Sequence, residues 1–455
     1  MVVARIPNFQ LRANSGALAV CRCVSAGKAH CRVATTPHSS LRYSPSHLLY
    51  LLAILLLCFM GVAFLFSTGY LGPSFAVRQN YLRQCVFLGI GAVLAIAFSA
   101  LPPGRISWRA VVFSGYFASI VLLIAVLFLG KSIGGARRWL SFGGFLLQPA
   151  EFARAFTILA AAALWDGKTL PKYWEFPLGL LCFLVPMGLI LLEPAYGNAA
   201  SLAVPMGILA CTRYLPRWLW NTLLLAVVIL VAAVSLAVLH LRQDSGEGQR
   251  RREALLAEDG PGGSILRGYH LRRVRSFLSS EGGWNEQQSL MAVAGGGLTG
   301  KGYLNGTMKN LGFLPRTVAP TDFIFAVVAE EGGLLFGVLP LMFLYWLLSM
   351  ILLHWATRAA DRLRLNILLG GMGLLLVHIT VGVGMAVRLL PVIGLPLPLL
   401  SYGGSFTLAV FLLLGAMAGA DHHREESTSS EKTTAPEESE FRLGFLMKVK
   451  VRRER

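Results

Sequence analysis

Ten apolar runs dominate the chain, and each is close to the length that a helix needs to cross a lipid bilayer. A hydrocarbon core of about 30 Å requires about 20 helical residues. Helices satisfy their own backbone hydrogen bonds, which lipid cannot do for them. The runs lie at 47–68, 81–101, 108–130, 145–165, 174–192, 198–213, 217–239, 323–353, 365–387 and 398–420. The sequence therefore predicts an all-α polytopic membrane protein with about ten transmembrane helices.

The composition agrees with a membrane protein and argues against nucleic acid as a partner. Hydrophobic residues make up 55% of the chain and charged residues only 14%, whereas soluble domains contain about 25% charged residues. The net charge of +18 matches basic residues in cytoplasmic loops and beside anionic headgroups. No groove-reading motif accompanies the charge, so we expect no nucleic-acid binding.

The basic residues also predict how the chain is oriented and divided. Segment 1–46 contains six basic residues and no acid, which favours a basic cytoplasmic N-terminal arm; a transit peptide with the same composition stays open. Short loops on the same side carry further basic residues, namely Arg105, Arg109, Lys168, Lys172, Arg213, Arg217, Arg358, Arg362 and Arg364. This pattern predicts a transmembrane domain at 47–420, a large outer loop at 240–321 between helices 7 and 8, and a disordered cytoplasmic tail at 421–455.

The stretch 311–333, LGFLPRTVAPTDFIFAVVAEEGG, places three carboxylates at or within a predicted membrane helix. Asp322 lies where a polar loop meets the apolar run, and Glu330 and Glu331 follow two turns deeper. Ionisable groups at membrane depth are costly and are usually functional. The residues alone favour an N-cap role for Asp322 over catalysis, because Asp is a good cap and complements the helix dipole.

Further charges lie near or inside the runs. The string GKSIGGARRWLSFGG contains Lys131, Arg137 and Arg138, and such cations beside glycines suit a phosphate; anchors at the membrane interface are the alternative. Glu151 and Arg154 share one helix face and are expected to pair with each other or with a neighbouring helix.

Arg83 and Arg388 are the cations that the sequence offers as partners for the intramembrane glutamates. Two segments rich in turn residues complete the pattern: GGWNEQQSLMAVAGGGLTGKGYLNGT, and MAVRLLPVIGLPLPLLSYGGSF. Glycine and proline at the density of the second segment break a helix, and irregular backbone at membrane depth must line a cavity or be buried in protein.

These segments resemble, in order, the motifs of the SEDS proteins, the bacterial RodA, FtsW and SpoVE group. The matching strings are GARRW with QPAEFAR, GGWNEQQS with GKG, TDFIFA with EE, and LLPVIGLPLP with SYGGS, over residues 47–420. Four ordered motifs are more specific than any single match. The resemblance implies an inverting peptidoglycan glycosyltransferase of the bacterial inner membrane that joins lipid II into glycan strands at the outer face. The LPVIGLPLP form is closest to RodA, which favours a role in elongation and cell shape and leaves division and sporulation open.

The resemblance also implies roles for single residues. Asp322 matches the acid on which polymerisation depends, in agreement with a base that takes the proton of the attacking hydroxyl. Arg137, Arg138 and Lys301 are expected to bind the pyrophosphate, and Gln288 and Ser289 match the substrate-binding motif. A class B penicillin-binding protein is the implied partner. A divalent cation, Mg²⁺ or Mn²⁺, is the one cofactor that the resemblance allows, and no dedicated ligand cluster for it is visible.

Some positions depart from the family pattern. Ala195 replaces the acid of the family's QPDLGT string, Pro320 replaces its usual histidine, and Arg154 replaces its usual lysine.

Two other functions stay open at this stage. One is a flippase for the lipid-linked precursor, since buried charges mark transport pathways. The other is a non-catalytic scaffold that recruits the transpeptidase.

Overall fold

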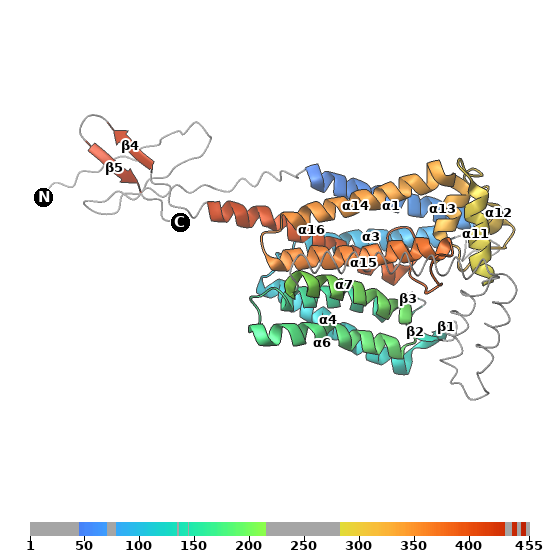
Figure 1. The fold of residues 1–455 in the computed structure, drawn as a ribbon, viewed down its shortest axis with the longest axis horizontal. Helices are drawn as coiled ribbons and strands as arrows, with labels where there is room; N and C mark the ends of the chain where they lie inside the picture. Colours follow the sequence, from blue (N-terminus) through green and yellow to red (C-terminus); the bar gives the residue numbers. More distant parts are fainter. Residues whose placement is uncertain are drawn as a thin grey trace. The chain divides into compact units, whose positions relative to one another are not determined.

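A computed structural model describes residues 45–70, 79–133, 136–143, 145–214, 283–432, 439–443 and 447–451. The chain divides into two units, Met1–Leu48 and Leu49–Arg455. The description below concerns the second unit, in which the helices run side by side (Figure 1).

Helices occupy nine of the ten predicted runs within the described residues. They are α1 (Pro45–Gly69), α3 (Asn80–Ser99), α4 (Ile106–Leu129), α5 (Pro149–Leu164), α6 (Lys172–Leu192), α7 (Tyr196–Tyr214), α13 (Ile324–Gly332) continued by η1 (Gly333–Val338) and α14 (Leu339–Thr357), α15 (Arg362–Ala386) and α16 (Gly404–Lys432). Seven segments of the described chain are long and apolar enough to span a membrane. The prediction of a polytopic helical membrane protein is therefore confirmed. The predicted span 217–239 lies outside the described residues.

Helix α5 lies at the centre of the bundle. Its run of alanines is almost fully buried, and it packs against α4, α6, α7, α15 and α16. Small side chains allow this close approach of helices, as is usual in membranes. Polar side chains join the surrounding helices: Tyr116 Oη of α4 donates to Cys182 O of α6 over 3.1 Å, and Asn366 Nδ2 of α15 donates to Trp165 O over 3.0 Å.

The two ends of the bundle differ. One end carries the strands β1 (Lys131–Ile133), β2 (Ala136–Phe142) and β3 (Phe145–Leu147) and the helices α11 (Trp284–Gly296) and α12 (Thr307–Asn310), at the right of Figure 1. The other end has ion pairs between helix termini and loops: Arg109 with Asp166, Arg213 with Glu175, and Arg364 with Asp361. Three of the basic residues that the sequence assigns to inside loops thus lie at this end.

Short strands accompany the helices of the predicted fold. The segment after α4 forms a three-stranded antiparallel sheet in the order β1-β2-β3. The predicted span 145–165 therefore begins with a strand, and α5 starts only at Pro149. Proline suits the first position of a helix, because its ring fixes φ at a helical value and because an N–H at that position would have no hydrogen-bond partner within the helix. Helix α16 begins at Gly404 and not at 398, and Leu399 has a φ of +63°, which a right-handed helix does not allow.

The eighth run changes its helical geometry where the sequence places glycines. Gly332 and Gly333 mark the passage from α13 to the π-helix η1, and Gly333 has a φ of +64°. Pro340 lies in the first turn of α14. Glycines are common at such irregularities of a helix.

Parts of the predicted disordered tail have regular backbone. Helix α16 continues to Lys432, and β4 (Ser439–Leu443) pairs antiparallel with β5 (Met447–Val451). Apolar residues alternate with polar ones in both strand sequences, a period typical of strands. The prediction of disorder rested on the polar composition of the tail and did not consider this alternation.

Candidate functional site

The candidate site lies at the end of the bundle that carries the sheet and α11, where motifs distant in the sequence meet. Asp322 lies in the turn before α13. A Cβ added to Gly394 would be 3.9 Å from Asp322 Oδ2, so the carboxylate faces the proline-rich loop after α15. Tyr402 N of the SYGGS segment donates to Pro320 O over 2.8 Å. The TDF and LPVIGLPLP–SYGGS motifs therefore form one structural unit.

Two further motifs extend this unit. A Cβ on Gly197, at the start of α7, would be only 2.6 Å from Ile393 O. The segment EPAYG, residues 193–197, therefore packs directly on the same loop. From β2, Arg138 donates through Nε to Glu193 O over 3.3 Å and through Nη2 to Pro194 O. Backbone and side-chain contacts therefore connect the GARRW motif, through EPAYG and the proline-rich loop, to Asp322.

The helix-cap role considered for Asp322 is not what the structure shows. Helix α13 begins at Ile324, its N-cap residue is Phe323, and the Phe323 side chain makes no capping hydrogen bond. Asp322 and Phe323 both donate their N–H groups to Val318 O, over 3.1 and 3.3 Å. This tight turn ends before the helix begins and places Asp322 outside the capping position. Its side chain is half-buried.

Glu193 adds a second carboxyl group to this end of the bundle. It is buried in the turn between α6 and α7, and burial raises the pKa of the carboxyl to about 8, against the opposing effect of the Arg138 charge. Arg138 itself is half-buried. The site thus combines a half-buried acid, Asp322, with a fully buried acid beside a guanidinium.

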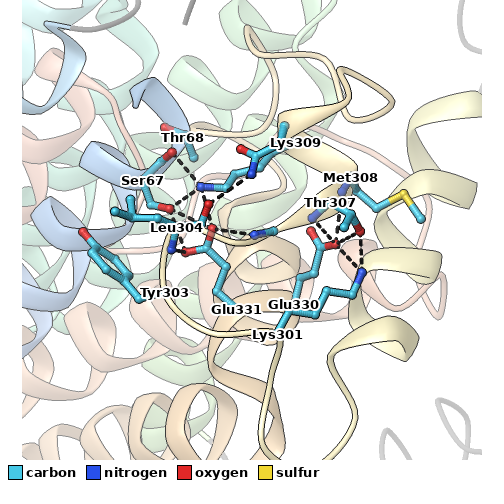
Figure 2. A network of polar contacts seen from close by, with 12 residues as sticks. Ser67, Thr68, Lys301, Tyr303, Leu304, Thr307, Met308, Lys309, Glu330 and Glu331 are labelled. Carbon is cyan, nitrogen blue, oxygen red and sulfur yellow. Dashed lines mark hydrogen bonds and ion pairs between the residues drawn. The ribbon is translucent and has the colours of Figure 1, made fainter. Parts of the chain in front are cut away.

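Glu331 anchors the loop that precedes α13 (Figure 2). Its carboxylate accepts from Ser67 Oγ of α1 over 2.8 and 2.7 Å and forms an ion pair with Lys309 Nζ of α12 over 2.5 Å. Lys309 also donates to Ser67 O over 2.7 Å. Burial lowers the pKa of the Lys309 ammonium, and the charge of Glu331 opposes that shift. This three-way contact joins α1, α12 and α13.

Glu330, the preceding residue, anchors the same loop (Figure 2). Its Oε1 accepts from Thr307 N over 2.8 Å and Met308 N over 3.0 Å, at the N-terminus of α12, and from Lys301 Nζ over 2.7 Å. Lys301, a predicted pyrophosphate ligand, is therefore already bound to a carboxylate. The cations beside Glu330 and Glu331 are Lys301 and Lys309, so the suggestion that Arg83 and Arg388 pair with them is wrong.

Arg83 and Arg388 lie elsewhere. Arg83 is exposed on α3, whereas Arg388 is buried after α15, with its Nε 3.9 Å from Glu286 Oε2 of α11. Gln288 and Ser289 are also buried on α11, and Ser289 Oγ donates to Ala386 O over 2.8 Å. These contacts seat α11 on the end of α15.

Glu151 and Arg154 are both buried on α5, at the side of a small cavity. They form no ion pair with each other among the described residues. Glu151 has a hydrogen bond with Ser405 of α16, and Arg154 Nη1 contacts Ser201 of α7 over 3.1 Å and His378 of α15 over 2.7 Å. Both side chains therefore contact neighbouring helices.

The remaining predicted cations are on the sheet. Lys131 is exposed and its Nζ donates to Ser141 Oγ over 3.1 Å. Arg137 is exposed on β2, next in the chain to Arg138. Their role in phosphate binding stays a prediction. Within the described residues, no group of three or more His, Cys, Asp and Glu side chains gathers as for a metal ion.

Comparison with known proteins identifies the family. The model of the Cell cycle protein family that comprises FtsW, RodA and SpoVE matches residues 47–426. The chain belongs to this FtsW/RodA/SpoVE family. The SEDS resemblance carried by the four motifs is thereby confirmed, and it extends over nearly all of the described helices.

Characterised members of the FtsW/RodA/SpoVE family resemble the chain over most of its length. It is 31% identical over 390 residues to the peptidoglycan glycosyltransferase MrdB of Escherichia coli strain K12, covering 85% of this chain and 95% of the relative. It is 28% identical over 421 residues to the peptidoglycan glycosyltransferase RodA of Treponema pallidum, covering 81% and 96%.

Solved structures of the family share the fold. A chain from a peptidoglycan synthase complex that coordinates polymerization and crosslinking gives a TM-score of 0.57 at 28% identity, covering 84% of this chain and 99% of that one. Thermus thermophilus RodA gives 0.56 at 26% identity, covering 85% and 98%. The helical arrangement described above is therefore that of the family.

Sequence reasoning missed Lys309, His378 and Glu193. His378 is the one histidine inside the apolar run 365–387, and a polar group there needs a partner. Glu193 follows the apolar run 174–192 directly, which is a signal for an acid at a membrane boundary. Nothing in the sequence around Lys309 distinguishes it from an ordinary loop lysine.

Proposed function

We propose that this protein is a peptidoglycan glycosyltransferase that joins lipid II disaccharides into glycan strands. The observation that supports this most strongly is the set of contacts that connect the GARRW, EPAYG and LPVIGLPLP–SYGGS segments to the TDF segment with Asp322, in a chain of the FtsW/RodA/SpoVE family. Relatives at 28% and 31% identity carry the name peptidoglycan glycosyltransferase. A half-buried carboxylate beside irregular backbone suits a reaction at the edge of the membrane.

The proposed reaction forms one bond and breaks one bond. A sugar hydroxyl of one lipid-linked glycan attacks the anomeric carbon of the other, and the bond from that carbon to the pyrophosphate oxygen breaks with inversion. Asp322 takes the proton of the hydroxyl as general base. The polyprenyl pyrophosphate leaves as an anion and needs positive charge, which Arg138 and Arg137 of β2 supply in this proposal.

A divalent cation is compatible with this arrangement. Mg²⁺ is usually held by one or two carboxylates together with substrate phosphates, so Asp322 and the pyrophosphate provide ligands of the right kind. Such a cation would neutralise charge on the leaving group. Lys301 is a weaker candidate for that task, because Glu330 already binds it.

Orientation and partner follow from the same proposal. Basic residues gather at the end of the bundle opposite Asp322, which by the positive-inside rule is the cytoplasmic end. Asp322 and the sheet would then lie at the outer face of the bacterial inner membrane, with both termini in the cytoplasm.

The match to a synthase complex that couples polymerization with crosslinking supports a class B penicillin-binding protein as partner. The RodA-like proline motif favours a role in elongation.

The test is glycan-strand synthesis from purified lipid II by wild-type protein and by Asp322→Asn, each co-purified with its class B partner. Asp361→Asn is the matched control, because it removes one carboxylate at the opposite end of the bundle and Asn also caps helices. We expect polymer from wild type and control and none from Asp322→Asn. Polymer from all three would remove Asp322 from the mechanism. No polymer from any, with active partner and substrate, would favour the flippase or the scaffold.

A further inference from the structure

Arg154 and His378 contact each other in the centre of the bundle, away from Asp322. Arg154 Nη1 lies 2.7 Å from His378 Nε2. A guanidinium only donates hydrogen bonds, so His378 Nε2 has to accept. The proton of a neutral imidazole is then on Nδ1.

The other ring nitrogen makes a contact that requires the same tautomer. His378 Nδ1 lies 2.9 Å from Pro396 O, and a carbonyl oxygen only accepts. Two contacts on opposite sides of the ring therefore agree on one protonation pattern, Nδ1–H with a bare Nε2. His378 therefore connects the guanidinium of Arg154 to the backbone of the proline-rich loop.

Arg154 is held on other sides as well. It is almost fully buried, and it donates to Ser201 Oγ over 3.1 Å and to Ala150 O over 3.3 Å. The ring of His378 stacks on Phe406 with centroids 4.9 Å apart. A buried donor that loses its partner costs more free energy than the hydrogen bond itself contributes, so this geometry is well defined.

The loop that receives the hydrogen bond is the loop that faces Asp322. Pro396 is two residues from Gly394, which has a φ of +73° and lies against the Asp322 carboxylate. Between α15 and α16 the backbone has no regular hydrogen-bond ladder, and buried side chains hold it instead. Tyr345 Oη donates to Pro398 O over 2.7 Å, and Ser401 Oγ accepts from Leu397 N over 2.9 Å.

We propose that His378 is a positioning residue for the transferase reaction: fixed by Arg154, it holds Pro396 and thereby sets the loop surface that faces Asp322. This rests on the proposed function. His378 touches neither the substrate nor Asp322 in this proposal, so its loss slows the chemical step without changing how tightly lipid II binds.

The experiment compares two substitutions that each keep one side of the imidazole. In His378→Asn the side-chain amide nitrogen takes the place of Nδ1 and still donates to Pro396 O. In His378→Gln the amide reaches the place of Nε2, and the contact with Pro396 is lost. Both remove the aromatic ring and its packing on Phe406, so each is the control for the other. Thermal unfolding of the purified complexes checks that both are folded.

Initial rates against lipid II concentration separate kcat from KM. We expect His378→Asn to lower kcat by about threefold, since the hydrogen bond to Pro396 O survives and, of the two polar contacts, only that with Arg154 is lost. We expect His378→Gln to lower kcat by about tenfold to a hundredfold, as small misplacements near a reacting group do. KM stays unchanged in both. Equal kcat values in two folded variants, or a better Gln than Asn, would overturn the proposal.

A measurement that does not depend on enzyme activity tests the contacts of His378 separately from the proposed transferase function. The ¹⁵N spectrum of histidine-labelled protein reports the tautomer of each ring, and the signals lost in His378→Asn identify His378. We expect the Nδ1–H form; a protonated Nε2 would overturn the inference even in an active enzyme. If wild-type protein makes no polymer, the proposed function fails, and the spectrum still tests the contacts of His378.

Discussion

Asp322 and the glutamate pair Glu330 and Glu331 belong to the same sequence stretch and have opposite environments. Both glutamates are almost fully buried and bind lysines and backbone N–H groups that come from the loop before α13. Asp322 is half-buried, lies outside any helix and faces the proline-rich loop. Acids from one short stretch of sequence therefore have different surroundings in the fold.

The difference lies in what surrounds each carboxylate. Lys309 and Ser67 occupy both oxygens of Glu331, which suits an anchor between helices. A general base needs access to a substrate hydroxyl, and Asp322 has the greater exposure. The comparison thus favours a structural role for the glutamate pair and leaves Asp322 as the acid proposed for the chemistry, and the following experiments test each side of it.

The largest effect is expected for Asp322→Asn. Loss of a general base costs about 10²–10⁴-fold in rate, whereas the isosteric amide leaves packing unchanged. Polymerisation should therefore be lost while the unfolding temperature of the complex stays that of wild type. If the variant is inactive because it is unfolded, Asp322 has a structural role like that of Glu330 and Glu331, and the proposed difference between them is wrong.

The second effect is a loss of stability in Lys309→Met. It leaves Glu331 buried with its counter-ion removed, and breaking such a pair costs about 3–5 kcal/mol. The side chains of Lys309 and Glu331 are only 2% and 0% exposed, so solvent does not compensate. Denaturant or thermal unfolding measures the effect. The double variant Lys309→Met with Glu331→Leu should recover part of the loss, and a double variant no more stable than the single one would contradict the ion-pair account.

A smaller loss is expected for Glu330→Gln. Its partner Lys301 is 28% exposed, so water replaces part of the lost interaction. The amide oxygen of Gln still accepts from Thr307 N and Met308 N. We expect about 1 kcal/mol of destabilisation, measured by the same unfolding assay. A loss as large as that of Lys309→Met would show that the two glutamates act as one unit.

The sequence predicted the helices better than it predicted the partners of the buried charges. Apolar run length is a local property, so nine runs appear as helices within the described residues. The pairing of Glu331 with Lys309, by contrast, depends on how a glycine-rich loop folds back on α1 and α13. Charge type alone suggested Arg83 and Arg388, which the fold places elsewhere. Likewise, only the turn at 318–323 reveals that Asp322 is not a helix cap.

Glu193 sharpens the comparison because it is buried like the glutamate pair and yet lies beside Arg138 of the candidate site. Neither of its carboxylate oxygens has a hydrogen-bond partner among the described residues, and burial raises its pKa to about 8. In the unfolded chain the pKa is about 4.3. The folded protein therefore binds this proton more tightly than the unfolded chain does.

The sign of the pH effect follows from that difference. Stability is highest below the unfolded-state pKa and falls as the pH rises through the window up to about 8, because the unfolded chain releases a proton that the folded protein retains. Glu193→Gln carries no such proton. Its unfolding temperature, relative to wild type, should therefore rise steadily between about pH 5 and pH 8, by a few degrees at most for a protein of this size. A constant difference over this range would mean that Glu193 is already ionised and paired, and that it resembles the lysine-bound glutamates and not a neutral buried acid.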